Sequence, residues 1–325
     1  MKKTSLATMK YRLYSTFVVC IVLALALLAM FIHVQSLNSR ISVLEDKATT
    51  TDRQLASYQR SLCSTIPKPI DVLTKYTVSS AGFDRTYHVH TPDNYDPSVR
   101  YPVIVSFDGI DGSGSRMEAY SGLDELPAVV VYPDSLPGKR GFTAWQGAPY
   151  SLEGTQDVQF VSDILKTLPS QYCVDSTRTF AVGMSNGGAF ATIVGCELGS
   201  QIRAVASISG AYYQTCQQQQ RTPSLLIVHS TTDGQAPFGG SVARRLPKVT
   251  QWTEKQAVER ACATTLPVKT IGATSYYDWL NCTDDSMLRF IVIQNQAHGW
   301  LALPEASIQR AQGTAGYIWK FFEES

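Results

Sequence analysis

The pentapeptide Gly183-Met184-Ser185-Asn186-Gly187 constrains the fold of this chain more than any other feature. An apolar run over residues 179–182 precedes it, and small and apolar residues over 188–194 follow it. This order predicts a strand, a tight turn and a helix, and the two glycines allow a cramped backbone with positive φ near Ser185. Such a turn holds the Ser185 hydroxyl out above the end of the strand, where it can act as a nucleophile.

Strand and helix patterns alternate along most of the chain. Strands are predicted at 86–91, 102–107, 128–132, 178–183, 203–208, 224–229 and 288–293, and helices at 157–168, 187–198, 250–262 and 305–323. This alternation is typical of an α/β fold with a mainly parallel sheet and helices on both faces. In open sheets of this kind, functional residues lie just beyond the carboxyl ends of the strands, so candidates are expected there.

An uninterrupted apolar run over residues 17–32 follows Lys2, Lys3, Lys10 and Arg12. With its flanking residues the run reaches the ~20 residues that a bilayer requires. No clear small-x-small cleavage site comes after it. The pattern favours a transmembrane anchor with the N-terminus in the cytoplasm and the rest of the chain outside. The alternative is a signal peptide, whose cleavage would give a secreted protein.

The segment after the apolar run has a weak heptad pattern. Its members, spaced by four and three residues, are Leu37, Ile41, Leu44, Ala48, Thr51, Leu55, Tyr58 and Leu62. The pattern predicts a helical or flexible stalk, with self-association through a short coiled coil as the alternative. We therefore expect a tail and anchor over 1–34, a stalk over 35–66 and a catalytic domain over 67–325.

Cysteine usage and charge limit the class of protein further. Six of the seven cysteines follow the apolar run, and no C-x-x-C occurs. Zinc and thioredoxin-like sites therefore have little support, whereas disulfides in an oxidising compartment explain the cysteines well. Spacing alone does not select their pairing. The net charge is +1 and the sequence has no basic stripe, so no nucleic-acid partner is expected.

A serine nucleophile needs a base, and the chain has five histidines. His33 lies at the membrane edge. His88 and His90 share one face of a predicted strand, which is typical of structural residues, with a metal pair as the alternative. His229 closes a strand and is expected to support the following loop. His298 remains, in the loop between the last predicted strand and the final helix, and is the predicted base.

Asp233 is the predicted partner of that base. It follows a strand end and lies between Ser185 and His298 in the chain, whereas a surface turn aspartate is the alternative interpretation. A carboxylate in this place would hold the tautomer of His298 and stabilise its imidazolium form.

Backbone N–H groups are expected to stabilise the oxyanion of a tetrahedral intermediate. One is the N–H of Asn186, directly after the nucleophile. The second is assigned to the N–H of Ile110, in the glycine-rich loop 108–114 after the predicted strand 102–107. A phosphate cradle is the alternative role of this loop, but neither of the two common phosphate-binding glycine motifs occurs there.

With these residues in place, the chain resembles the polyhydroxybutyrate depolymerase/feruloyl esterase group of α/β-hydrolases, which is carbohydrate-esterase-1-like, over residues 76–322. The matching pieces, in order, are Asp108-Gly109 with Gly112-Ser113, Val131-Tyr132-Pro133-Asp134, Trp145, Asp157-Val158-Gln159-Phe160-Val161, Val174-Asp175 before Arg178, Gly183 to Gly188, His229 with Asp233 and Pro237, and His298 with Trp300. The resemblance implies an extracellular serine esterase of the α/β-hydrolase fold with Ser185, Asp233 and His298 as triad, no metal or organic cofactor, and a Cys262–Cys282 disulfide.

Two departures from the family pattern affect what can be inherited. Asp108 replaces the usual histidine before the oxyanion glycine and is expected to change the geometry or the pH response of that loop. Leu301-Ala302 replaces the family's Pro-Gly after Trp300, so the identity of the substrate does not follow from the resemblance. Trp145 and Trp300 are candidate walls of the substrate cleft, with core tryptophans as the alternative.

The sequence thus predicts an extracytoplasmic serine carboxylic-ester hydrolase that forms an acyl-enzyme. Its expected substrates are polysaccharide-linked acyl or feruloyl esters, or hydroxyalkanoate-type polyesters. An acyltransferase that uses the same acyl-enzyme is one alternative. A catalytically silent protein that binds glycans or polymers is the other, because an anchor, a stalk and a cleft with aromatic walls suit that role too.

Overall fold

The computed structural model describes residues 63 and 73–325 apart from 140, 155, 215–220, 304–306 and 309–310, together with residues 23, 26–28, 30–44 and 47 near the N-terminus. The chain divides into two compact units, Met1–Leu62 and Cys63–Ser325.

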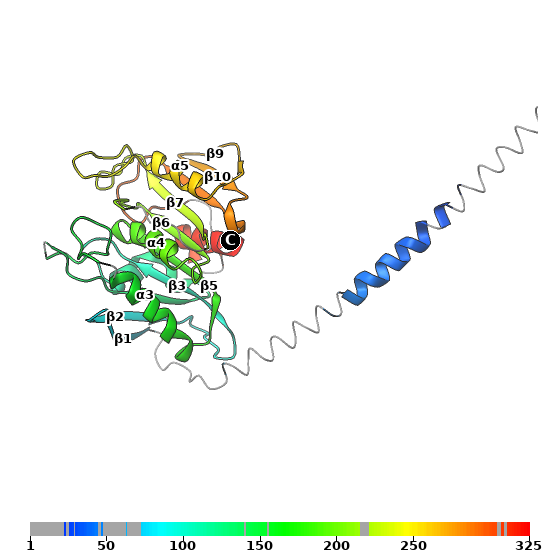
Figure 1. The fold of residues 1–325 in the computed structure, drawn as a ribbon, viewed down its shortest axis with the longest axis horizontal. Coiled ribbons are helices and arrows are strands. Elements are labelled where there is room, and N and C mark those ends of the chain that lie inside the picture. Colours follow the sequence, from blue (N-terminus) through cyan, green and yellow to red (C-terminus); the bar gives the residue numbers. More distant parts are fainter. Residues whose placement is uncertain are drawn as a thin grey trace, which may run out of the picture. The chain divides into compact units, whose positions relative to one another are not determined.

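The first unit contains a helix over Ala26–Leu44 (Figure 1). Among the described residues it is the one helix whose length and composition suit a membrane span, and a signal sequence would have the same properties. The helix crosses residue 34, the predicted boundary between anchor and stalk. The predicted self-association of the stalk rests mainly on residues 48–62, which lie outside the described ranges.

An eleven-stranded sheet forms the centre of the second unit, in the order β1-β2-β4-β3-β5-β6-β7-β11-β10-β8, with β9 paired to β10 (Figure 1). The strands are β1 (Leu73–Ser80), β2 (Phe83–His90), β3 (Tyr101–Phe107), β4 (Val129–Pro133), β5 (Val174–Met184), β6 (Ala204–Ile208), β7 (Ser224–Ser230), β8 (Thr264–Thr265), β9 (Lys269–Ile271), β10 (Thr274–Leu280) and β11 (Leu288–Ile293).

The sheet is mixed, so the prediction of a mainly parallel sheet is correct only for its centre. The strands from β4 to β11 in this order run parallel, while β1, β2, β8, β9 and β10 pair antiparallel. The physical reason is visible at β1 and β2. Only Ala81 and Gly82 connect them, both with positive φ, and so short a connection joins antiparallel strands.

Helices cover both faces of the sheet, as predicted. They are α2 (Gly114–Ser121), α3 (Gln156–Thr167), α4 (Asn186–Glu197), α5 (Val249–Glu259) and α6 (Gly313–Glu324), with short 3-10 turns η1 (Leu123–Glu125), η2 (Leu168–Ser170) and η3 (Thr283–Asp285). One large core cluster joins the sheet to α3, α4 and α5, and a second joins it to α2 and α6. Adjacent residues of β3 alternate between them, since Val103 and Val105 belong to the first and Ile104 to the second.

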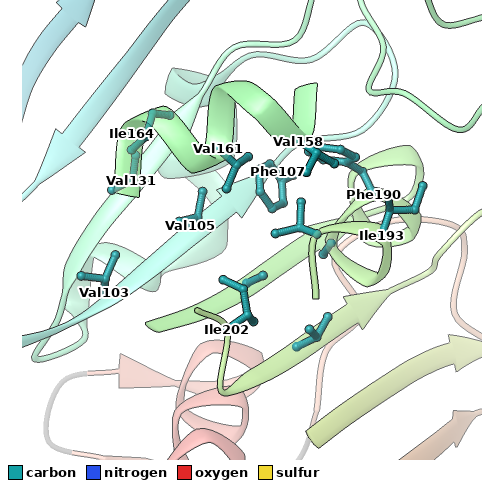
Figure 2. Packing of buried hydrophobic residues seen from close by; sticks show 14 of the residues in the cluster. Val103, Val105, Phe107, Val131, Val158, Val161, Ile164, Phe190, Ile193 and Ile202 are labelled. Carbon is teal, nitrogen blue, oxygen red and sulfur yellow. The ribbon is translucent and has the colours of Figure 1, made fainter. Parts of the chain in front are cut away.

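Figure 2 shows the first of these clusters from close by. The side chains of β3 meet those of α3 and α4 in it, and the labelled residues from these three elements are Val103, Val105, Phe107, Val158, Val161, Ile164, Phe190 and Ile193. This packing fixes the carboxyl end of β3 against the start of α4, where Ser185 lies.

The predicted helix over 305–323 is wrong in its first half. The short strands β12 (Ser307–Ile308) and β13 (Ala311–Gln312) pair with each other there, and α6 begins only at Gly313. Gly313 has a φ of 63°, which a residue inside an α-helix does not adopt. The local composition of residues 305–312 favours a helix, so only the glycine marked the true boundary.

Two disulfides have both of their cysteines among the described residues of the second unit, and Cys196 in the same unit is also disulfide-bonded. The Cys262–Cys282 bond joins the segment after α5 to the end of β10, and it confirms the pairing that the family resemblance implied. The Cys63–Cys173 bond ties the first residue of this unit to the segment before β5.

Candidate active site

Ser185 occupies a strained turn between β5 and α4. Its φ is 57° and its ψ is −119°, a combination that residues other than glycine rarely adopt. The positive φ therefore belongs to the serine itself, whereas Gly183 and Gly187 are needed for close approach. A Cβ on Gly183 would lie 2.2 Å from the carbonyl oxygen of Gly187, and one on Gly187 would lie 2.2 Å from that of Phe107.

The structure brings Ser185, His298 and Asp233 into one chain of hydrogen bonds. His298 Nε2 lies 2.8 Å from Ser185 Oγ, and His298 Nδ1 lies 2.7 Å from Asp233 Oδ2. The three side chains come from the ends of β5, β11 and β7, where candidates were expected. Ser185 and Asp233 are buried and His298 is partly buried. This arrangement can move a proton from the serine hydroxyl to the imidazole.

The environment of Asp233 favours its carboxylate form. Burial alone would raise the pKa of Asp233, but the hydrogen bonds from His298 and from the N–H groups of Ala236 and Gln235 outweigh it and hold this pKa below its usual value. The carboxylate is therefore ionised at neutral pH and can stabilise a protonated His298.

His229 supports the loop that carries Asp233, as predicted. It is fully buried, and its Nε2 donates to the carbonyl oxygen of Ala236 at 2.7 Å while lying 3.6 Å from Asp233 Oδ2. Burial lowers the pKa of His229, so the ring is neutral at physiological pH.

The other two strand histidines contact helix α2. His88 Nδ1 lies 2.8 Å from Ser115 Oγ and His90 Nδ1 lies 2.9 Å from Glu118 Oε1. No group of three or more potential metal ligands occurs among the described residues.

Three hydroxyl groups that the sequence did not single out hold the loop of His298. Ser230 and Thr232 donate to the carbonyl oxygen of Gln296 at 2.6 Å and 2.9 Å. Ser209 donates to the carbonyl oxygen of Gly299 at 2.8 Å. The sequence could have indicated these residues by their positions at or just after the ends of β6 and β7. It could not have indicated their partners, because no sequence pattern links a hydroxyl group to a carbonyl group 60 to 90 residues later.

The loop after β3 lies against Ser185 and engages most of its own N–H groups. The N–H of Gly109 donates to Asp108 Oδ1, that of Asp111 to the Thr143 carbonyl, and that of Gly112 to the Gly109 carbonyl. Within the described ranges, the N–H of Ile110 has no acceptor in the protein. A Cβ on Gly109 would lie 3.2 Å from Ser185 Cβ, so this loop is adjacent to the serine.

The N–H of Asn186 is the other predicted donor. Asn186 is the first residue of α4, and the first N–H groups of a helix have no partner within it. The helix N-terminus also carries a partial positive charge that favours an anion. Asn186 thus adjoins Ser185 in the chain, and the loop that carries Ile110 lies against Ser185.

Trp145 is not a wall of the substrate cleft, contrary to the prediction. Its side chain is only 1% exposed, and its Nε1 donates to the carbonyl oxygen of Asp108 at 3.0 Å. Its backbone N–H donates to Asn186 Oδ1 at 2.7 Å, and its carbonyl accepts from Asn186 Nδ2. Trp145 therefore fastens the loop of Asp108 to the start of α4. Trp300 is half-buried, and its ring packs edge-on against the Tyr120 ring with 6.1 Å between the ring centroids. Trp300 remains a candidate cleft residue.

Two further residues at this site were missed from the sequence. Arg116 Nε donates to Asp108 Oδ2 at 2.7 Å, and the Tyr120 hydroxyl donates to Asp108 Oδ1 at 2.6 Å. Both lie on α2, a helix that the sequence patterns did not predict. The signal that could have found them is Asp108 itself, because a carboxylate beside an oxyanion loop needs a cation or donors nearby.

Comparisons with known proteins point to esterases. The family model described as "Putative esterase" matches residues 79–271. A "Probable feruloyl esterase C" from Aspergillus clavatus is 28% identical over 160 residues, which cover 49% of this chain and 58% of the relative. "Feruloyl esterase D" from Neurospora crassa is 29% identical over 173 residues, which cover 49% of this chain and 56% of the relative.

Among solved structures, an acetyl xylan esterase from Aspergillus awamori superposes with a TM-score of 0.58 at 13% identity, over 78% of this chain and 100% of that one. At this identity the likeness shows the shared fold. The chain spans less than two thirds of the length of the two feruloyl esterases that it matches. The family match, in contrast, covers more than half of the 325 residues, and the chain therefore belongs to this esterase family.

Proposed function

We propose that this chain is an extracytoplasmic serine carboxylic-ester hydrolase with Ser185 as nucleophile, His298 as general base and Asp233 as the carboxylate that orients the base. One observation carries the proposal. A continuous chain of hydrogen bonds, 2.7 Å and 2.8 Å long, runs from Asp233 through His298 to a serine in a strained turn at a helix N-terminus.

The proposed reaction begins when Ser185 Oγ attacks the ester carbonyl carbon while His298 Nε2 accepts the hydroxyl proton. The carbonyl oxygen becomes an oxyanion that the N–H groups of Asn186 and Ile110 stabilise. As the intermediate collapses, the bond to the alcohol oxygen breaks and His298 returns the proton to it. Water then attacks the acyl carbon while His298 Nε2 accepts its proton. The bond to Ser185 Oγ breaks, His298 returns the proton to Ser185 Oγ, and the acid leaves.

The proposed substrates are feruloyl or acetyl esters carried by a polysaccharide. The support comes from the names of the relatives, two feruloyl esterases and an acetyl xylan esterase. The half-buried Trp300, two residues after His298, offers an aromatic surface that suits a feruloyl ring or a sugar face. The disulfides support a site outside the cytoplasm.

The test uses the full chain and its Ser185→Ala variant on methyl ferulate, acetylated xylan, hydroxybutyrate oligomers and 4-nitrophenyl acetate. We expect the wild type to cleave the first two best, and Ser185→Ala to lower kcat by about 10⁴-fold to 10⁶-fold. Ser200→Ala, which truncates an exposed serine after α4, is the matched control and keeps wild-type turnover.

A fluorophosphonate probe separates an enzyme from a silent binder, because only an activated serine reacts with it. It labels the wild type and spares Ser185→Ala if the proposal is correct. Turnover by Ser185→Ala at the wild-type rate would refute the assignment of the nucleophile. Added alcohol acceptors distinguish the acyltransferase alternative, since transfer would yield a new ester in place of the free acid.

A further inference from the structure

We infer that Asp108, Arg116 and Tyr120, here called the Asp108 brace, position the Ile110 N–H and balance the charge beside the oxyanion. The inference rests on the proposed ester hydrolysis and adds three positioning residues to it. None of the three touches the reacting atoms; they act through the loop that follows β3.

The Asp108 carboxylate is 2% exposed and receives four hydrogen bonds. Its Oδ1 accepts from the Gly109 N–H at 2.7 Å and from the Tyr120 hydroxyl at 2.6 Å. Its Oδ2 accepts from Arg116 Nε at 2.7 Å and from the Ser113 N–H at 3.3 Å. A carboxylate has about four acceptor positions, so every one of them is used. An amide or a carboxylic acid in this place could not accept all four.

These bonds fix the orientation of the peptide between Asp108 and Gly109. Its N–H points to the Asp108 carboxylate, and the carbonyl of Asp108 accepts from Trp145 Nε1 at 3.0 Å. With the Gly109 N–H engaged, the next N–H along the chain, that of Ile110, is the one left to face the substrate. The brace thus determines which N–H of this loop can serve the oxyanion.

Charge balance is the second consequence. A carboxylate next to a developing oxyanion opposes it, since like charges repel strongly where water is excluded. The Arg116 guanidinium neutralises this carboxylate, and its Nη1 also donates to the Asp111 carbonyl in the same loop at 3.1 Å. The hydrogen bond to Asp108 raises the pKa of Arg116, so the guanidinium stays protonated.

The brace is compact because Arg116 and Tyr120 are four residues apart on α2 and therefore share one face of that helix. Space around the carboxylate is tight, since a Cβ on Gly112 would lie 2.4 Å from Asp108 Oδ2. The Tyr120 ring also meets Trp300, in the segment after His298. One side chain thus contacts both the oxyanion loop and the base loop.

A charge cycle tests the inference in the full chain. Arg116→Gln leaves an unbalanced carboxylate beside the oxyanion. We expect kcat to fall by about 10-fold to 100-fold, which does not exceed the effect of removing one oxyanion donor. We expect KM to stay within about twofold of the wild-type value. Asp108→Asn together with Arg116→Gln removes both charges while keeping an oxygen for the Gly109 N–H. We expect this double variant to recover most of the kcat lost in Arg116→Gln.

A merely structural brace gives the opposite pattern, because the double variant would then be at least as impaired as either single one and kcat would follow Tm. That result overturns the inference, as does an unchanged kcat in Arg116→Gln. Tyr120→Phe removes one hydroxyl only and keeps the test usable if the charge variants do not fold; we expect a lower kcat at unchanged KM.

Arg178→Gln is the matched control. Arg178 forms a surface ion pair with Asp175 at 2.9 Å near the other end of β5, and its loss should leave kcat unchanged. The activity of the wild type, measured against Ser185→Ala as the inactive reference, separates this inference from the proposed function. An inactive wild type refutes the ester hydrolase, whereas an active wild type with unaffected brace variants refutes only the brace.

Discussion

Gly187 is the residue at which the turn around Ser185 meets the end of β3. A Cβ there would lie 2.2 Å and 2.3 Å from the backbone oxygens of Phe107 and Asp108, and neither oxygen can move without shifting the strand. We predict that Gly187→Ala lowers the free energy of unfolding by about 1–3 kcal/mol, the usual range for overpacking. Since the shift displaces Ser185 relative to Ile110, kcat should fall by about 10²-fold.

Gly239→Ala is the control for this substitution, because a Cβ on that glycine meets no atom within 4 Å. Urea unfolding and turnover of 4-nitrophenyl acetate measure both effects. Equal behaviour of the two alanine variants would contradict the close approach at Gly187.

His229 gives the protein a pH-dependent stability. Burial lowers the pKa of His229 below the ordinary value of 6.5, so below that pH the unfolded chain binds a proton that the folded chain does not. Stability therefore falls as the pH drops from 6.5 towards the folded-state pKa. We predict a smaller drop in Tm for His229→Gln than for the wild type between about pH 7.5 and about pH 5. Parallel Tm profiles would argue against a buried neutral imidazole.

The sequence grouped Ser185, Asp233 and His298, which the structure brings into hydrogen-bond contact, because their order and their places after strands are local properties. Burial is not a local property, and so Trp145 was assigned to the cleft although its indole lies in the core. The partners of Asp108 were missed for a related reason. They lie on α2, an eight-residue helix with one fully buried apolar side chain, Met117, which is too little for a periodic pattern.

At the scale of elements, the central strands were predicted within a few residues because they are continuously apolar. The strands β1, β8 and β9 at the edges, and β10 next to the edge, were missed. β1 is half exposed and polar along alternate positions, and β8 has only two residues. The short strands before α6 were mistaken for helix because their composition is compatible with both. Edge elements therefore depend on pairing with the sheet, which the local sequence does not encode.

The contact between β2 and α3 depends on a buried ion pair. Arg85 Nη1 lies 2.8 Å from Asp157 Oδ1, both side chains are 1% exposed, and the guanidinium also stacks on Phe160 at 4.1 Å. We predict that Arg85→Met lowers the free energy of unfolding by about 3–5 kcal/mol, because it leaves a buried carboxylate unpaired.

The surface pair of Arg178 and Asp175 is the control, and Arg178→Met should cost less than about 1 kcal/mol in the same urea titration. Similar losses in the two variants would show that burial of the Arg85–Asp157 pair has no energetic consequence.

The two described disulfides differ in the length of chain that they close. The Cys63–Cys173 bond spans 110 residues and the Cys262–Cys282 bond spans 20. Loop-closure entropy predicts that serine at both positions of the longer loop costs about 5 kcal/mol, and at both positions of the shorter loop about 3 kcal/mol. Urea unfolding without reductant measures the two losses. The reverse order would mean that strain or residual structure in the unfolded chain outweighs loop entropy.

At the scale of the whole molecule, the parallel centre of the sheet explains why a site can form at all. The carboxyl ends of the parallel strands β3, β5, β7 and β11 lie on the same side of the sheet, and each leads to one part of the candidate site. β3 leads to the loop of Ile110, β5 to Ser185, β7 to Asp233 and β11 to His298. The antiparallel additions at both sides extend the sheet without altering these strand ends, so the incorrect prediction of the sheet's margins left the predicted site intact.

The N-terminal helix determines whether this site stays at a membrane. The side chains of Leu27, Met30 and Phe31 are each more than half exposed. Insertion into a bilayer would remove these apolar side chains from water. If the helix is an anchor, the full chain sediments with membranes after alkaline carbonate washing, and its N-terminal peptide is still present by mass spectrometry. Arginine at both Leu23 and Leu27 adds about 5–7 kcal/mol to the cost of insertion and should release the chain. A mature chain that begins after Ile32 and stays in the supernatant would instead establish a cleaved signal.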